Sequence, residues 1–180
     1  MTPEFLQAIE QLKAWISAGS VDLVLQTRKS GVLQNQTETL GFKVRALTQP
    51  ELQRIEQMCP QPLPPAYLHF LQQVGCGEFF IGEYHATFDI FGPEELQQTQ
   101  ALIAQEIAEE DEPTEDQFFM IGVHNSMGDW MGFCTSRPIP DNYEVFSHEA
   151  PIYCYAEDAF WKSFEDWVVK AVESKGRETL

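Results

Sequence analysis

Apolar residues in the first part of the chain recur mainly at helical spacing. Between residues 2 and 19 they are spaced i, i+4, i+7 and i+11, which predicts a helix that presents Phe5, Ile9, Leu12 and Ile16 on one face. A second, short helix is predicted over residues 21–29, before a glycine at position 31. Residues 41–47 alternate between apolar and polar side chains, which predicts a strand.

The next helices carry start and stop signals. Thr48 and Glu51 have the spacing of a capping box, in which each side chain satisfies a backbone amide at a helix start. That helix ends at the proline-rich residues 60–65, and the following one ends at Gly75. Two strands and a longer helix are then predicted at residues 78–81, at residues 84–91 and from residue 92 onward.

After Asp116 the period of the pattern becomes strand-like. Short segments rich in aromatic and β-branched residues predict strands at residues 118–123, 130–134, 143–146 and 152–155. A last helix is predicted over residues 158–173, with a core-facing stripe of Phe160, Phe164, Trp167, Val168 and Ala171. Since the connections are short, this order predicts an α+β single domain. Its antiparallel β-sheet has helices packed on one side, a helical N-terminus and a closing C-terminal helix.

The charge of the chain is concentrated in its middle. Residues 55–136 contain fourteen carboxylates and no lysine or arginine, within a chain whose net charge is −17. A field of this sign repels nucleic acid and anionic lipid and attracts a basic partner. The alternative is that these carboxylates are simply a solvated surface.

Composition limits the class of protein. The 180 residues, 43% of them hydrophobic, are sufficient for one packed domain. No apolar run approaches the length of a membrane span, and the N-terminus has no recognisable secretory signal. The four cysteines lie far apart without CxxC spacing, which favours reduced, buried thiols, and we expect a cytoplasmic protein.

Three segments have an order and spacing found together in a known family. The first segment is LTQPELQRIEQMCPQPLPPAYLHFLQQVGCGEF, which contains a short helix, an LP turn, a Tyr-containing helix and a Gly-rich turn. The second is the central hairpin FFMIGVHNSMGDWMGFC. The third is the closing helix EDAFWKSFEDWVVKAV. Together they resemble the SUKH superfamily of Smi/Knr-like domains over about residues 47–172. Two departures stand out: residues 75–77 are Gly-Cys-Gly where Asn-Gly-Gly is more usual, and residues 1–46 have no clear match.

The resemblance implies a protein-binding module without catalytic activity. SUKH proteins include bacterial immunity proteins that neutralise polymorphic toxins, many of them nucleases, and Smi/Knr-type regulators of fungal cell-wall assembly. The resemblance divides the chain into an N-terminal helical extension with a first strand (1–46), packed on the core, a SUKH-like domain (47–174) and a C-terminal tail (175–180). It also implies structural roles for the family-motif residues Leu63, Pro64, Tyr67, Gly75, Gly77, Gly122, Gly128, Asp129, Phe164 and Trp167.

The charge and the resemblance converge on an immunity protein that neutralises a toxin. Nuclease toxins carry basic clefts that grip a polyanion, and an acidic protein fills such a cleft in place of the nucleic acid. Trp130 and Trp161 are candidate aromatic anchors. The predicted partner-binding residues are Glu106, Glu109, Glu110, Asp111, Glu112, Glu115, Asp116 and Trp130. We expect a protein partner, a basic toxin domain, with no nucleic acid, no membrane and no cofactor bound; the oligomeric state is left open.

Other kinds of site fit the sequence less well. The acidic run lacks the alternating oxygen ligands and central glycine of a calcium-binding EF-hand loop, and the four histidines lack metal-binding spacing, so no metal is expected. His124, Asp129 and Cys134 lie around one hairpin, but no oxyanion hole or nucleophile elbow accompanies them, so we expect no enzyme. The alternative function is a regulatory or scaffolding protein of the Smi/Knr cell-wall assembly type.

Overall fold

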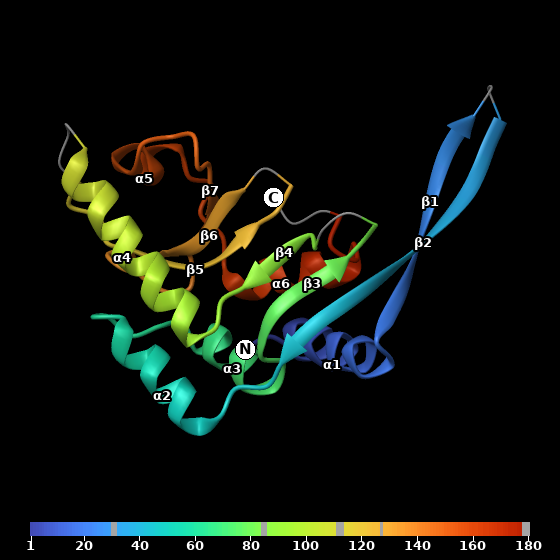
Figure 1. Ribbon diagram of the computed structural model, residues 1–180, viewed down its shortest axis with the longest axis horizontal. Helices are drawn as coiled ribbons and strands as arrows, with labels where there is room; N and C mark the ends of the chain where they lie inside the picture. Colours follow the sequence, from blue (N-terminus) through green and yellow to red (C-terminus); the bar gives the residue numbers. More distant parts are fainter. Residues whose placement is uncertain (30–31, 84–85, 111–113, 127, 178–180) are drawn as a thin grey trace.

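The computed structural model describes residues 1–29, 32–83, 86–110, 114–126 and 128–177 (Figure 1). Its centre is an antiparallel sheet whose seven strands lie side by side in chain order. The strands are β1 (Ser20–Lys29), β2 (Val32–Arg45), β3 (Cys76–Ile81), β4 (Phe88–Ile90), β5 (Phe118–His124), β6 (Asp129–Cys134) and β7 (Tyr143–Phe146). Each strand pairs with the next one along the chain, as short connections favour.

Helices precede, interrupt and close this sheet. They are α1 (Pro3–Ala18), α2 (Gln49–Met58), α3 (Pro65–Gln73), α4 (Pro93–Glu109), α5 (Tyr155–Asp158) and α6 (Phe164–Glu173), with a 3₁₀ turn η1 (Ile152–Cys154) before α5. In the part of the chain that the structure describes, no helix has the length and apolar character needed to cross a membrane. The predicted α+β class, with its helical N-terminus and C-terminal helix, is confirmed.

The larger hydrophobic core lies between one face of the sheet and helices α1, α3 and α6. Tyr67 of α3 meets Phe164 of α6 edge to face, with 5.5 Å between ring centroids. Trp167 packs on Phe88 of β4 at 4.8 Å, and all four side chains are almost completely buried. Burial of each ring stabilises the fold by roughly 1.5–3 kcal/mol.

A second apolar cluster lies on the opposite face of strands β5–β7. Phe119 and Ile121 belong to the larger core, whereas Met120 between them belongs to the second, because successive side chains of a strand point to opposite faces. Helix α4 covers this face, and the side-chain amide of Gln100 donates to the carbonyl oxygen of Met120 at 2.7 Å. The helices therefore do not all pack on one side of the sheet, as was predicted, because Met120 and its neighbours make the second face of β5–β7 apolar as well. The cluster consists of Ile103, Met120, Phe146, Ile152 and Tyr155.

The predicted helix at residues 21–29 is wrong. These residues form β1, which pairs with β2 over ten positions from Ser20↔Gly41 to Lys29↔Val32. Val21 is buried while Val24 is exposed, an arrangement set by the two faces of a hairpin. Local pattern does not separate a short strand from a short helix here, since the partner strand lies outside the window.

Two predictions near the C-terminus are also wrong. The predicted strand at residues 152–155 is the turn η1 and the first residue of α5, and the last helix begins only at Phe164. Ser163 sets that start, because its hydroxyl accepts the N–H of Asp166 at 3.1 Å. Phe160, predicted in the core, lies before the helix and is 87% exposed.

The predicted strand over residues 84–91 is only partly present. Strand β4 spans Phe88–Ile90, and residues 84 and 85 lie outside the described residues. Its neighbours are β3 and β5, so it forms the middle of the sheet despite its three-residue length.

The large side chains of the family motif lie inside the molecule. Leu63, Pro64, Tyr67, Phe164 and Trp167 are all buried. Three of its glycines lie where strand backbones approach closely. A Cβ at Gly75, Gly77 or Gly122 would lie 2.0–2.1 Å from a carbonyl oxygen of a neighbouring segment, and Gly75 and Gly77 also have positive φ. Only glycine fits these positions without backbone movement.

Gly128 lies in the turn between β5 and β6, and Asp129 is the first residue of β6. Gly128 has a φ of +85°, which favours glycine. The Asp129 carboxylate accepts the backbone N–H of His148 at 3.2 Å and contacts its ring Nδ1 at 3.1 Å. Asp129 thereby joins the start of β6 to the loop after β7.

Candidate partner-binding site

The acidic run predicted to bind a partner spans the end of α4 and the approach to β5. Its described members are Glu106, Glu109, Glu110, Glu115 and Asp116, whereas Asp111 and Glu112 lie outside the described residues. Glu109 and Glu115 are exposed, and the other three are half-buried. The run is therefore not one uniform surface, and its members differ in what they contact.

Glu110 is engaged by the backbone of a distant segment. Its carboxylate accepts the N–H of Ile152 and, at 3.2 Å, the N–H of Tyr153. These amides belong to the start of η1, where N–H groups have no acceptor within the turn. Glu110 thus caps η1 and fastens the end of α4 to the segment that follows β7.

Asp116 is engaged as well. It accepts the Ser136 hydroxyl at 2.8 Å and the Cys134 thiol at 3.6 Å, and so joins the start of β5 to the end of β6. Glu109 accepts the side-chain amide of Gln105 at 2.8 Å on the surface of α4. The exposed carboxylates of Glu109 and Glu115 are therefore the members best placed to meet a partner.

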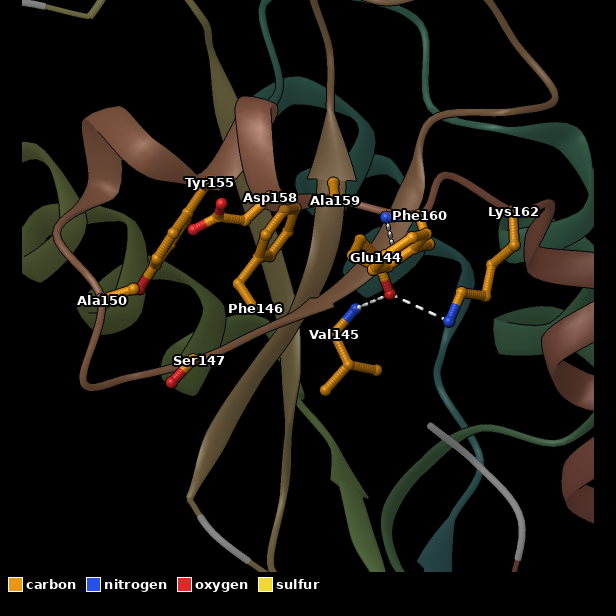
Figure 2. Close-up of a pocket in the computed structure, with 10 residues that line it drawn as sticks. All are labelled: Glu144, Val145, Phe146, Ser147, Ala150, Tyr155, Asp158, Ala159, Phe160 and Lys162. Atoms are coloured by element: carbon orange, nitrogen blue, oxygen red, sulfur yellow. Dashed lines mark hydrogen bonds and ion pairs between the residues drawn. The ribbon is translucent and has the colours of Figure 1, made fainter.

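A pocket of about 460 Å³ opens beside β7, on the sheet face that carries the second apolar cluster (Figure 2). Strand β7, the turn after it and residues 155–162 form its lining. The rings of Phe146 and Tyr155 stack at 4.8 Å within the lining and make it largely apolar. The sequence did not predict this pocket, because its residues come from segments that meet only in the fold.

Glu144 links the two chain segments that line the pocket. Its carboxylate, which is nearly buried, accepts the backbone N–H of Phe160 at 2.7 Å and pairs with the Lys162 ammonium at 2.9 Å (Figure 2). It also accepts the N–H of Val145 at 2.8 Å. These contacts fasten residues 160–162 to β7, and they leave the aromatic ring of Phe160 in solvent.

Phe160 is the functional candidate that sequence reasoning placed wrongly. An exposed aromatic ring beside an apolar pocket is typical of an anchor for a protein partner. The sequence did contain a signal: Ser163 is followed by Glu165 and Asp166, which marks a helix start after Phe160. The stripe of Phe160, Phe164 and Trp167 therefore begins one turn outside the helix.

Carboxylates of the acidic run interact electrostatically with a residue of the pocket lining. Burial, followed by the nearby carboxylates of Glu106 and Glu110, raises the pKa of Tyr155. Asp158 lines the opening. Among the described residues around it, Lys162 is paired with Glu144 and Arg137 lies 4.5 Å over the ring of Trp161. The pocket therefore combines apolar walls with nearby carboxylates, an arrangement that suits a long basic side chain.

Trp130 and Trp161, considered as anchors, are both half-buried. Each packs against the second apolar cluster, and Trp161 contacts Phe146 at 5.9 Å. A part of each ring remains accessible, so their role at an interface stays a prediction.

The residues of the alternative Cys-His-Asp site lie apart. In the β5–β6 register, Cys134 is opposite Phe118, whereas His124 is opposite Asp129 at the other end of the hairpin. The six residue steps from Phe118 to His124 along β5 correspond to about 20 Å. Burial raises the pKa of the Cys134 thiol, which disfavours the reactive thiolate. Over the described ranges no cluster of three or more potential metal ligands is found.

Two comparisons relate this chain to known proteins. The model of the SMI1 / KNR4 family (SUKH-1) matches residues 46–170. The chain is also similar to the immunity protein RhsIB of Dickeya dadantii (strain 3937), with 25% identity over 172 residues, which cover 95% of this chain and 96% of the relative. No solved structure matches the chain.

Proposed function

This chain belongs to the SMI1 / KNR4 family (SUKH-1), and from that premise we propose that it is an immunity protein that binds and neutralises a polymorphic toxin. The observation that carries the proposal is the match to RhsIB, which is named as an immunity protein and is aligned over nearly the full length of both chains. A relative that shared only the family domain would be weaker support, since the family also contains regulators.

The target is a toxin domain with a basic cleft, of the kind that nucleases use to grip a polyanion. Fourteen carboxylates without a single lysine or arginine over residues 55–136 give the protein a field that attracts such a cleft. Glu109 and Glu115 are exposed within this stretch. They compete with phosphate groups for the basic residues of the toxin.

The pocket supplies the uncharged part of the interface. Phe160 packs against an apolar patch of the toxin, and the pocket beside it receives the aliphatic stem of an arginine or lysine whose charged end faces Asp158. Neutralisation then consists of occluding the toxin's substrate cleft, with no chemical step by this protein. It acts in the cytoplasm, where a nuclease toxin meets its substrate.

A regulatory or scaffolding role of the Smi/Knr cell-wall assembly type is the alternative, because the family match alone supports it equally. The two functions differ in the number and strength of partners. An immunity protein forms one tight complex with a basic toxin, whereas a scaffold binds several cellular proteins weakly.

The test is affinity capture followed by an activity assay. Lysate and secreted proteins of the source organism are passed over the immobilised protein and eluted with rising salt. The retained protein is purified, and its cleavage of DNA and RNA is measured with and without an equimolar amount of this chain. One basic protein whose cleavage is abolished at a 1:1 ratio supports the proposal. Capture of many weak partners, or a retained toxin that is not inhibited, contradicts it.

A further inference from the structure

The paired residues 22–39 of β1 and β2 form an arm that extends away from the body of the protein (Figure 1). Strand β2 pairs with β3 only from Gly41 onward, and β1 is the edge of the sheet. Over the described residues 22–29 and 32–39, the arm strands therefore pair, as strands, only with each other. The eight residues of β1 that lie in the arm, at about 3.3 Å each, give it a reach of roughly 25 Å.

The arm contributes little to the core. Val21 and Leu40 at its base are buried, but beyond them the described side chains are half-buried or exposed. An isolated two-stranded hairpin is at best marginally stable in water, so an arm of this length is not explained by folding. A projecting element that does not build the core is suited to binding.

One face of the arm carries exposed apolar side chains. Val24 is 55% exposed and Leu33 is 65% exposed. Leu33 is opposite Arg28, which lies four residues from Val24 along β1, so both apolar side chains project from the same face, about 13 Å apart. Gln36, opposite Leu25, projects from the other face.

The arm lacks the negative charge of the body. Residues 22–39 contain two basic and two acidic residues, a net charge of zero, whereas residues 46–180 contain six basic and twenty-four acidic residues, a net charge of −18. The arm is therefore not drawn to a basic cleft as the acidic surface is. Its face fits an apolar, weakly charged surface of a partner.

The arm lies outside the residues that the family model matches. The family model begins at residue 46, after the arm, whereas the match to RhsIB leaves only about nine residues of this chain unaligned and so includes most of residues 1–46. The N-terminal region is thus shared with a protein named for immunity but lies outside what the family model describes.

We propose that the arm is a second toxin-contacting element, which holds an apolar surface of the toxin domain outside its basic cleft through Val24 and Leu33. The inference rests on the proposed immunity function and extends it. The acidic surface governs encounter and occlusion of the cleft, and the arm governs which toxin is held. Contact through uncharged groups makes the contribution of the arm insensitive to salt, unlike that of the carboxylates.

The test measures the affinity of the protein for the captured toxin domain at about 50 mM and about 500 mM NaCl. Between these two concentrations the screening length changes about threefold or more. Val24→Glu and Leu33→Glu each weaken binding about tenfold at both concentrations, as expected for loss of an apolar contact residue. Gln36→Glu adds the same charge on the opposite face and leaves affinity within about twofold. Thermal unfolding of all three variants controls for folding.

A shortened arm provides an independent variant. Replacing residues 24–37 by Asn-Gly joins Leu23 to Glu38, which are already opposite one another, through a two-residue hairpin turn. The shortened protein folds and binds at least tenfold more weakly at both salt concentrations. Wild-type affinity in the glutamate variants and the shortened protein overturns the inference and leaves the immunity function intact. A loss with Gln36→Glu equal to that with Val24→Glu also overturns it, whereas failure of the wild-type protein to inhibit any toxin overturns both proposals.

Discussion

Glu144 of β7 and Lys162 form an ion pair of 2.9 Å at the base of the pocket. The carboxylate is nearly buried and also accepts two backbone N–H groups, whereas the ammonium is partly exposed. The pair connects the edge of the sheet to the segment that leads into α6. It thereby fixes the position of Phe160, whose own backbone N–H is one of the two donors.

Removing Glu144 is therefore more damaging than removing Lys162. Glu144→Ala leaves a partly buried ammonium and two backbone donors without an acceptor, and we expect a loss of roughly 3 kcal/mol or more in the free energy of unfolding. Lys162→Met keeps the apolar stem and the two backbone contacts, and we expect a loss of roughly 1–2 kcal/mol. Urea unfolding measures both. Equal losses for the two variants would contradict the assignment of Glu144 as the centre of this network.

A substitution at Phe160 is expected to affect toxin binding and to leave the stability of the fold nearly unchanged. Since its side chain is 87% exposed, Phe160→Ala changes the free energy of unfolding by less than about 0.5 kcal/mol. As an interface anchor it is expected to weaken toxin binding by about 2 kcal/mol, close to thirtyfold. Titration calorimetry with the captured toxin measures this loss. Leu6→Ala, which truncates an exposed apolar residue on α1, is the control, and a similar affinity loss in both variants would remove Phe160 from the interface.

The elements that the sequence predicted well are those with local determinants. The Thr48–Glu51 capping box appears at the start of α2 as expected, with both reciprocal hydrogen bonds present. The β5–β6 hairpin likewise follows from two short segments rich in aromatic and β-branched residues on either side of a glycine turn. The misassigned segments depend on distant residues instead. Strand β1 exists because β2 pairs with it, and η1 is capped by Glu110, which lies 42 residues before Ile152 in the chain.

In the candidate site, too, the sequence predicted what depends on local features and missed what depends on tertiary contacts. Charge counting identified the acidic run, but it does not distinguish Glu110, which caps η1, from Glu109, which is exposed. The pocket was missed because Glu144, Tyr155 and Phe160 converge only through tertiary contacts. Periodicity placed Phe160 in the core, since a stripe at i, i+4 and i+7 carries no information on where the helix starts.

The acidic surface is tested by charge reversal at residues that the fold does not use. Glu109→Lys with Glu115→Lys is expected to weaken toxin binding by tenfold or more at about 50 mM NaCl, and by much less at about 500 mM, because screening removes the interaction of exposed charges. The association rate, measured by stopped-flow, carries most of the change. Glu110 is excluded from this variant, since its reversal would uncap η1.

The matched control is Glu56→Lys with Glu173→Lys, which changes the net charge equally at exposed residues of α2 and α6. We expect a smaller decrease in the association rate, because part of the steering comes from the net field of the protein. If both double variants bind with the same rate at each salt concentration, the region of Glu109 and Glu115 has no special position in the complex.

The start of α2 gives a pH-dependent prediction. Hydrogen bonds from the Thr48 backbone N–H and hydroxyl, and then from Arg45, lower the pKa of Glu51 from its usual 4.5 to about 2. Because the folded-state pKa is lowered, the stabilisation is fully present above about pH 4.5 and is lost as the pH falls toward 2. We expect Glu51→Gln to unfold at a lower temperature than the wild-type protein at pH 7, and the difference to shrink as the pH approaches 2. Glu56→Gln, on an exposed position of the same helix, should show no such pH-dependent difference, and a constant gap for Glu51→Gln across the range would mean that the charge of Glu51 does not stabilise α2.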